Sequence, residues 1–506
     1  MLHRGYCEAM THRFKPAFLL APLAALLMAA APTGPASAPP REERMARAAE
    51  LLDAGKPDDA LAILNGLLSE SDLPADKGQV EGLRSYALAR QGKFAEARTA
   101  IEFAADAAMT PTPLLLRQLF VLRAITGDVP AAGQTLQLIA VTEPKWLAEL
   151  PADLVAEVLS ATSDDDRKFD LALTLVTAGY APADQTVGDG DALRLAVIAG
   201  LARRGRLDEA QPHVAALINP VSLVRLAIDR RFQSLWPALE ARLGPGADVA
   251  DAAFIAAAER RLAANPDSLV ARAGVAEALN IASKEPEALA RMAGVDTTPA
   301  ALARLGEREL WTLSLKANLL ADAGRFDEAL ATLDAVAALP AETHPNTTAF
   351  RIIAADMAEE AGRHDEALRR VGAIDAKGLN PFGIQALAGI RICALARAGR
   401  TADATAAASA LPAGWSADGN NRAVQAALAC LGRLDAAAAL LIKRLEAEDS
   451  RDDTLFELQP FLIADRPNAP DRATKAAMRG LKARPDVKAA FARWGRDLPA
   501  AVSPPR

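Results

Sequence analysis

Residues 324–329 read Gly324-Arg325-Phe326-Asp327-Glu328-Ala329, and this pattern occurs eight times in the 506-residue chain. It consists of Gly, usually a basic residue, two variable positions, usually an acidic residue, and Ala. The pattern starts at Gly55, Gly92, Gly127, Gly205, Gly324, Gly362, Gly399 and Gly432. The spacings are 37, 35, 78, 119, 38, 37 and 33 residues, a period of 33 to 40 if the two long gaps hold two and three units. Such a period is typical of helical-repeat proteins.

Each position of the pattern has a role in a turn between two helices. Gly adopts the left-handed conformation that commonly ends a helix. The basic residue lies beside the last carbonyls of the first helix, and the acid lies in the first turn of the second, where the helix dipole favours each charge. Ala lets the two helices cross closely. Nine positions after Gly, an apolar residue continues the buried stripe of the second helix; these residues are Leu64, Ile101, Leu136, Val214, Leu333, Val371, Ala408 and Leu441.

These turns resemble those of the tetratricopeptide repeat family, whose repeats are close to 34 residues long. The resemblance covers most of residues 41–450, although the Trp and Tyr usual in the first helix are mostly replaced here. It implies an all-α fold, a right-handed α-solenoid of about ten to twelve helical hairpins. Degenerate copies of the turn pattern, at 166–172 and 283–288, lie in the two long gaps between turn glycines.

The chain divides into four predicted segments. Residues 1–38 are predicted to be a signal peptide, because basic residues precede an apolar run and Ala36-Ser37-Ala38 has the pattern of a cleavage site. Residues 39–245 and 246–450 are predicted as two superhelical halves with a hinge at Gly244-Pro245-Gly246. Residues 451–506 depart from the period and are predicted as a helical cap over the last apolar face.

The predicted signal peptide indicates a periplasmic or secreted protein, with no integral membrane span once the peptide is removed. The alternative is that residues 1–38 are retained as an N-terminal anchor. The Ala-rich sequence, with Arg used more than Lys, suggests a bacterium.

The overall composition excludes some classes of protein. A net charge of −7 argues against a nucleic-acid partner. A hydrophobic share of 51% excludes a wholly disordered chain, and three Cys in a chain of this length exclude a disulfide-stapled miniprotein.

Motifs that would carry chemistry are missing from the sequence. It contains no Gly-x-x-x-x-Gly-Lys-Ser/Thr loop, no His-Glu-x-x-His and no Gly-x-Ser-x-Gly. The acids of 164–166 and of 188–191 are predicted to cap helices and not to bind ions. We therefore expect no enzyme, and no catalytic, cofactor or metal site.

Cys393 and Cys430 are 37 residues apart, about one period. Cys393, however, stands six residues before its turn glycine and Cys430 only two. This offset is about one helical turn, added to the ~8–10 Å between packed helices. A disulfide needs Cα atoms within about 7 Å, so the spacing argues against a bond, which remains the alternative.

The resemblance also implies where a partner binds. In that family, ligands lie along the concave surface of the first helices, which residues two, three, six, ten and thirteen before the turn glycine face. Carried over, these offsets predict a partner-binding groove that runs from basic to acidic to basic along the chain: Tyr86, Arg90, Arg117, Arg203, Trp311, Asn318, Asp322, Asp356, Glu359, Glu360, Arg397 and Arg422. Ordinary solvated helix faces are the alternative for any one of them.

The function that the resemblance implies is a non-catalytic protein–protein interaction scaffold that binds a polypeptide segment. The expected context is a cell-envelope assembly or secretion process. An accessory subunit of an exopolysaccharide export apparatus is the alternative, although the few groove aromatics argue against direct sugar binding. An enzyme whose site is assembled across repeats is the third hypothesis.

Overall fold

The structure, a computed structural model, describes residues 39–70, 72–181, 187–411, 421–464 and 471–504. In these segments the chain forms α-helices and short 3-10 helices, and the only strand-like feature is an isolated antiparallel bridge between Asp229 and Gly495. The prediction of an all-α helical-repeat solenoid is confirmed. The predicted signal peptide, residues 1–38, lies outside the described residues.

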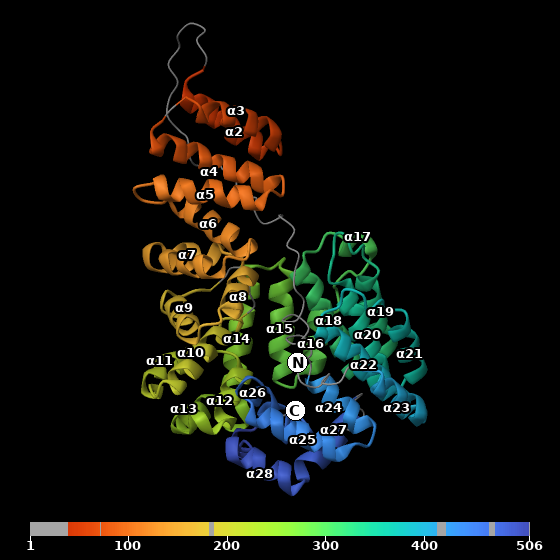
Figure 1. Cartoon of the computed structure of the whole chain (residues 1–506). Helices are drawn as coiled ribbons and strands as arrows, with labels where there is room; N and C mark the ends of the chain where they lie inside the picture. Colours follow the sequence, from red (N-terminus) through yellow and green to blue (C-terminus); the bar gives the residue numbers. More distant parts are fainter. Residues whose placement is uncertain (1–38, 71, 182–186, 412–420, 465–470, 505–506) are drawn as a thin grey trace. The chain divides into compact units, whose positions relative to one another are not determined.

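The described residues form two compact units, 39–181 and 187–504 (Figure 1). The division does not fall at Gly244-Pro245-Gly246, where the sequence favoured a hinge. The physical reason is that this segment packs inside the second unit. Ala247 is fully buried, and Gly246 lies beside the backbone of Ser503.

The 39–181 unit consists of four helical hairpins that follow one another in chain order (Figure 1). Prolines at the starts of several helices fit the first turn, where a missing N–H costs nothing. The helices are α2 (Arg41–Asp53), α3 (Pro57–Leu68), α4 (Pro74–Arg90), α5 (Phe94–Ala107), α6 (Pro113–Ile125), α7 (Val129–Thr142), η2 (Pro144–Glu149), α8 (Ala152–Ala161) and α9 (Asp165–Thr177).

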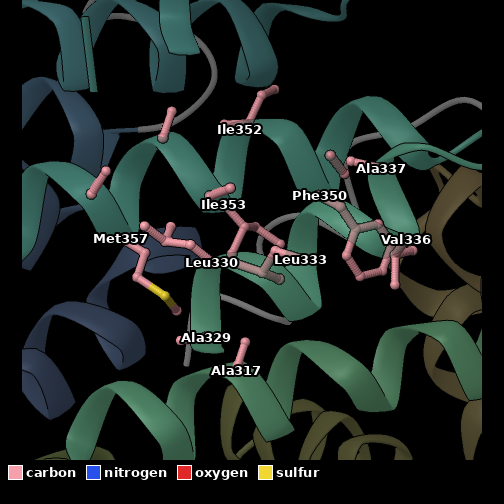
Figure 2. Packing of buried hydrophobic residues seen from close by; sticks show 14 of the residues in the cluster. Ala317, Ala329, Leu330, Leu333, Val336, Ala337, Phe350, Ile352, Ile353 and Met357 are labelled. Carbon is pink, nitrogen blue, oxygen red and sulfur yellow. The ribbon is translucent and has the colours of Figure 1, made fainter. Parts of the chain in front are cut away.

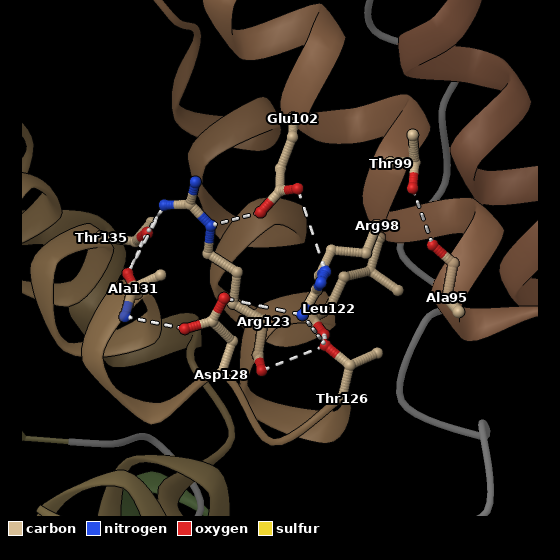
Figure 3. Close-up of polar contacts among 10 residues, drawn as sticks. All are labelled: Ala95, Arg98, Thr99, Glu102, Leu122, Arg123, Thr126, Asp128, Ala131 and Thr135. Carbon is tan, nitrogen blue, oxygen red and sulfur yellow. Dashed lines mark hydrogen bonds and ion pairs between the residues drawn. The ribbon is translucent and has the colours of Figure 1, made fainter.

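Charged side chains connect neighbouring hairpins of this unit (Figure 3). The Arg123 guanidinium of α6 lies 3.1 Å from Glu102 of α5 and donates to the Thr135 hydroxyl of α7 at 2.9 Å. Arg98 of α5 lies 3.6 Å from Asp128, the residue that caps α7. These contacts join α5, α6 and α7 around their apolar packing.

The 187–504 unit begins with irregular helices and continues with regular hairpins. Its irregular first part contains α10 (Asp191–Arg203), η3 (Leu207–Ala210), α11 (Gln211–Ala215), α12 (Pro220–Ile228), η4 (Arg230–Leu235), α13 (Trp236–Leu243), η5 (Pro245–Ala247) and α14 (Asp248–Ala264). The hairpins are α15 (Leu269–Ile281) with α16 (Glu285–Met292), α18 (Glu307–Asp322) with α19 (Phe326–Ala337), α20 (Thr347–Glu360) with α21 (His364–Gly372), α22 (Pro381–Arg397) with α23 (Thr401–Ser409), and α24 (Asn421–Cys430) with α25 (Leu434–Glu446); α17 (Pro299–Leu302) precedes α18.

The turn glycines adopt the conformation that the pattern predicts. All eight have φ between +68° and +79°. At Gly324, its N–H donates to the Ala321 carbonyl and the next N–H to the Leu320 carbonyl, both at 2.8 Å, and the same two bonds occur at all eight turns. This is the Schellman motif, which satisfies carbonyls at the helix end. Ser283, with φ of +56°, makes the same pair of hydrogen bonds, so the degenerate copy of the pattern at 283–288 forms the same turn.

The basic residue of the turn has a partner more specific than the helix dipole. The guanidinium of Arg325 lies 2.6 Å from the Glu328 carboxylate, three residues later in the next helix. Arg206 and Arg400 make equivalent pairs with the acids of their own turns. These side chains are largely exposed, so each pair contributes at most about 1 kcal/mol.

The Ala five residues after each turn glycine is completely buried at all eight positions. Figure 2 shows one case, in which Ala329 of α19 faces Ala317 of α18 inside a hydrophobic cluster that is centred on α18, α19 and α20 and extends to α22. Small side chains at this position let the two helices of a hairpin approach closely, as the pattern predicts.

We expect Ala329→Leu to destabilise the protein by about 1–3 kcal/mol, because extra methylene groups in a packed core force side chains and backbone to shift. Ala331→Leu on the same helix is the matched control, since Ala331 is exposed. Urea unfolding followed by circular dichroism measures both. Equal unfolding midpoints for the two variants would contradict this account of the turn.

The acids of 164–166 and 188–191 differ in their roles. Asp164 caps α9 by accepting from the Arg167 N–H at 2.9 Å, as predicted. Asp191 does not cap its own helix. It is buried, and its carboxylate accepts the N–H groups of Ile218 and Asn219 at 2.8 and 2.7 Å, just before α12. The prediction was wrong because only the tertiary structure brings these N–H groups to Asp191.

The C-terminal segment consists of α26 (Glu448–Glu457), α27 (Arg472–Ala483), α28 (Pro485–Trp494) and η6 (Ala500–Val502). Three of these helices, α26, α27 and α28, pack against α25, the last helix of the regular hairpins. The segment also contacts α12, η4 and η5 from the start of the same unit. In the 187–504 unit, the last helices therefore pack against helices near the start of the same unit.

Candidate functional site

The first helices of the hairpins in the 187–504 unit line its inner side. Among these first helices, α15 contacts α18, and α22 contacts both α20 and α24. The second helices α19, α21 and α23 make no comparable contacts with one another in the described part of the chain. First helices of neighbouring hairpins thus approach one another more closely than second helices do, which places the first helices on the concave side of the curve.

Five of the predicted groove residues come together on this concave face. Asp356, Glu359 and Glu360 belong to the last two turns of α20, whereas Arg397 ends α22 and Arg422 lies in the first turn of α24. We call these five residues the α20 charge cluster. Successive repeats bring them together, because each stands at a fixed offset from a turn glycine.

One ion pair orders the cluster. The Arg397 guanidinium donates to both oxygens of the Glu359 carboxylate at 2.8 and 2.9 Å, and Glu359 is buried. The same guanidinium donates to the Thr474 hydroxyl of α27 at 2.9 Å. Arg422 lies 4.0 Å from Glu457 of α26. One terminal nitrogen of the Arg397 guanidinium contacts both Glu359 oxygens and the other contacts Thr474, and these charge-assisted bonds fix the direction of the Arg397 side chain.

Asp356 and Glu360 are different. They lie one helical turn apart, are only partly accessible, and make no hydrogen bond or ion pair with any residue that the structure describes. Burial raises the pKa of Asp356 to about 6, against the opposing charges of Arg422 and Arg397. Burial and the carboxylates of Asp356 and Asp471 raise the pKa of Glu360 well above its ordinary value. The cluster thus holds two carboxyl groups without a direct partner.

Some residues of the site were not predicted. Thr474, Glu457 and Asp471 come from the C-terminal segment, which has no repeat period to place them. Outside this cluster, Glu277 on α15 stands six residues before Ser283, the same offset that Asp356 has from Gly362, so the degenerate turn at 283–288 could have identified it. Burial, together with the charge of Asp189, raises the pKa of Glu277 to about 7.

The remaining predicted residues do not join this cluster. Arg203 lies 3.1 Å from Glu448, and Arg117 lies 3.2 Å from Glu149. Asn318 is half-buried and Asp322 exposed on α18. Three of the twelve belong to the 39–181 unit, namely Tyr86, Arg90 and Arg117. Tyr86 packs against the hydrophobic cluster of α2, α3 and α4, and burial raises the pKa of its hydroxyl.

Trp311 was predicted in the groove, and this prediction was wrong. Its side chain is 7% exposed and belongs to the hydrophobic cluster of α18, α19 and α20. Its ring centroid lies 4.7 Å from that of Phe350. A large apolar ring gains more from burial between two helices than from a position on an open face.

Cys393 and Cys430 form a disulfide, contrary to the expectation from their spacing. Their Cα atoms are 5.2 Å apart. The spacing argument assumed an ordinary distance between helices, but α22 and α24 approach more closely. A Cβ atom on Gly389 would lie 3.1 Å from the Ala423 carbonyl oxygen. The bond joins the two helices that carry Arg397 and Arg422.

The raised pKa values predict a pH dependence. Protonated carboxyls of the native state lose their protons later than those of the unfolded chain, so stability falls as the pH rises from about 4 through 6. We expect Asp356→Asn/Glu360→Gln to flatten this fall, as measured by thermal unfolding between pH 4.5 and 8. Glu287→Gln/Asp365→Asn, which changes two exposed acids on outer helices, should keep the wild-type slope.

In the described part of the chain, no group of three or more His, Cys, Asp or Glu side chains is arranged to hold a metal ion. Within the same residues, none of the helices combines the length and the apolar character that a membrane crossing requires.

No protein-family model matches this sequence, and no curated protein matches it. Among solved structures, the chain is similar to the C-terminal part of a TPR repeat-containing protein from Cytophaga hutchinsonii, at 11% identity and a TM-score of 0.27, over 57% of this chain and 93% of that one. It is also similar to the APC/C hetero-tetramer Cut9–Hcn1, at 12% identity and a TM-score of 0.25, over 90% and 89%. A third similar structure is the P58(IPK) TPR domain, at 14% identity and a TM-score of 0.20, over 80% and 99%.

The fold assignment rests on the chain's own turns. Eight Schellman glycines, each followed by a buried Ala, and the hairpins that they connect make this chain an all-α solenoid of helical hairpins.

Proposed function

We propose that the protein is a non-catalytic scaffold that binds a polypeptide segment on the concave face of the 187–504 unit. The observation that carries this proposal is the pair Asp356 and Glu360, two acids on that face without a hydrogen bond or ion pair among the described residues. A cationic side chain of a partner would stabilise their charged forms and offset the penalty of their burial.

The arrangement suits a polypeptide better than a small molecule. The members of the α20 charge cluster come from α20, α22 and α24, so a partner that contacts all of them must extend across successive repeats. Most of the other predicted groove positions are Ala or Gly in the sequence, and such small side chains would leave room for a backbone. Ordered ion pairs such as Glu359–Arg397 keep the surface rigid, which lowers the entropy lost on binding.

We place this scaffold outside the cytoplasm, in a bacterial cell-envelope assembly or secretion process. Two features support the location. Residues 1–38 have the pattern of an export signal. The Cys393–Cys430 disulfide is of a kind that persists in oxidising compartments such as the periplasm.

The experiment compares capture by wild type and by Asp356→Lys/Glu360→Lys. Each purified protein is immobilised, exposed to periplasmic extract, and its bound proteins are quantified by mass spectrometry. We expect the reversal to reduce the main captured protein by about tenfold or more, because it replaces attraction with like-charge repulsion. Circular dichroism verifies that both proteins keep their helices.

The matched control is Glu287→Lys/Asp365→Lys, which makes the same charge change on the outer helices α16 and α21. It should capture as much as wild type. Equal losses in both variants would show that net charge alone matters, and unchanged capture by the Asp356 and Glu360 variant would remove these residues from the binding face.

A further inference from the structure

The 187–504 unit is closed by an interface that differs in chemistry from the contacts between its hairpins. We call it the closure interface. It joins α12, η4, α13 and η5, within residues 220–247, to α26, α28, η6 and Arg496 of the C-terminal segment. The hairpins pack through apolar side chains, whereas at the closure interface buried apolar residues such as Leu455 and Phe456 are accompanied by polar contacts that arginine side chains mostly supply.

The first group of contacts is centred on Arg225 of α12. Its guanidinium lies 2.7 Å from Asp452 and 2.7 Å from Asp453, and 4.9 Å from the ring centroid of Phe456. The Arg225 side chain is 12% exposed, but the two aspartates are 42% and 63% exposed. Water and salt therefore reach the acidic half of this group.

The second group is centred on Arg496, which follows α28. Its backbone N–H donates to the Ile228 carbonyl at 3.0 Å, and its guanidinium donates to the Ala227 carbonyl at 2.8 Å. The guanidinium also lies 2.6 Å from Glu240 and 3.6 Å from the ring centroid of Trp236. One residue thus joins the C-terminal segment to both α12 and α13.

A glycine, Gly495, stands next to Arg496 where the C-terminal segment contacts the end of α12. Gly495 is in extended conformation, which any residue adopts, so its backbone does not require glycine. A Cβ atom there would clash with Leu455 and lie 3.0 Å from the Ile228 carbonyl oxygen. Glycine at this position is explained by the close approach of the two segments.

We propose that the closure interface is a separable latch. The helices α26, α28 and η6 release α12, η4, α13 and η5 while the hairpins from α15 to α25 stay folded, and release opens the concave face to a polypeptide. The latch itself rests on the contacts above, and its use for partner entry rests on the proposed function. The physical reason is that exposed ion pairs weaken when salt screens them, whereas the apolar contacts of the hairpins do not.

The test is hydrogen–deuterium exchange of the full chain without any partner. In wild type, raising NaCl from 0.05 to 1 M should accelerate exchange of the Arg496 amide by about tenfold, while amides of α18, α19 and α20 change by less than about twofold. Arg225→Glu should produce the same acceleration at low salt, because its carboxylate would face Asp452 and Asp453.

Arg370→Glu is the matched control. Arg370 also contacts two acids, Asp334 at 2.6 Å and Glu366 at 2.9 Å, but it joins the outer helices α19 and α21. It should leave exchange of the Arg496 amide unchanged. If Arg225→Glu fails to fold, the salt series on wild type decides alone.

Two results would overturn the latch. One is exchange of the Arg496 amide that responds to neither salt nor Arg225→Glu. The other is equal acceleration in α18, α19 and α20, which would show that the closure opens only when the hairpins unfold. Because no partner is present, neither result bears on the proposed function, whose own failure would appear as unchanged capture by Asp356→Lys/Glu360→Lys.

Discussion

Replacing Phe350 with Ala should destabilise the protein by about 3–5 kcal/mol, the largest effect that we expect from one substitution. Phe350 is 2% exposed in the hydrophobic cluster of α18, α19 and α20, and its ring contacts that of Trp311. Val336 lies beside it (Figure 2). Its removal takes away a large buried apolar surface and leaves a cavity that neighbouring helices fill only in part.

Urea unfolding followed by tryptophan fluorescence and circular dichroism measures this effect. The matched control is Phe103→Ala, because Phe103 on α5 is 42% exposed and loses little contact when truncated. We expect a change below about 1 kcal/mol for the control. Similar losses for both phenylalanines would contradict the assignment of Phe350 and Trp311 to the core.

Removing the disulfide should have the second-largest effect. Cys393→Ser/Cys430→Ser opens a covalent loop that spans 37 residues, and the chain-entropy treatment gives a loss of about 3–4 kcal/mol. The loss should be concentrated in the hairpins α22/α23 and α24/α25, because each repeat contacts only its neighbours along the solenoid.

The measurement is urea unfolding of both proteins with and without a phosphine reductant. Reduced wild type should unfold at the same urea concentration as the double variant, and the double variant should not respond to the reductant. The reasoning would be wrong if oxidised wild type and the double variant had the same midpoint. Hydrogen exchange in α22 and α24 shows whether the loss is local.

Local signals in the sequence were enough for the hairpins. At the turns, conformation depends on neighbours in the chain, since only a residue that tolerates positive φ can end the first helix there. The offset from a turn glycine then determines which face of a helix a residue occupies. This is why Asp356, Glu360, Arg397 and Arg422 were predicted on one face, and why Trp311, at an offset that lies near the boundary of the core, was not predicted correctly.

Contacts between residues distant in sequence could not be predicted in the same way. The Cys393–Cys430 bond depends on the close approach of α22 and α24 at Gly389. The spacing of the two cysteines in the sequence does not reveal this short distance between helices. Asp191 accepts N–H groups from 27 and 28 residues later in the chain. Thr474 and Glu457 reach the α20 charge cluster from a segment without a repeat period.

By itself, the sequence determined that this protein is a stack of helical hairpins, because turn geometry and helix periodicity are local properties. The tertiary structure alone decided that residues 448–503 meet residues 220–247, and that two compact units are separated before residue 187 and not at Gly244-Pro245-Gly246. The physical reason is that the curvature of a solenoid accumulates from small packing differences at every repeat interface. The sum of these differences, and not any one motif, determines where the first and last helices of the 187–504 unit meet.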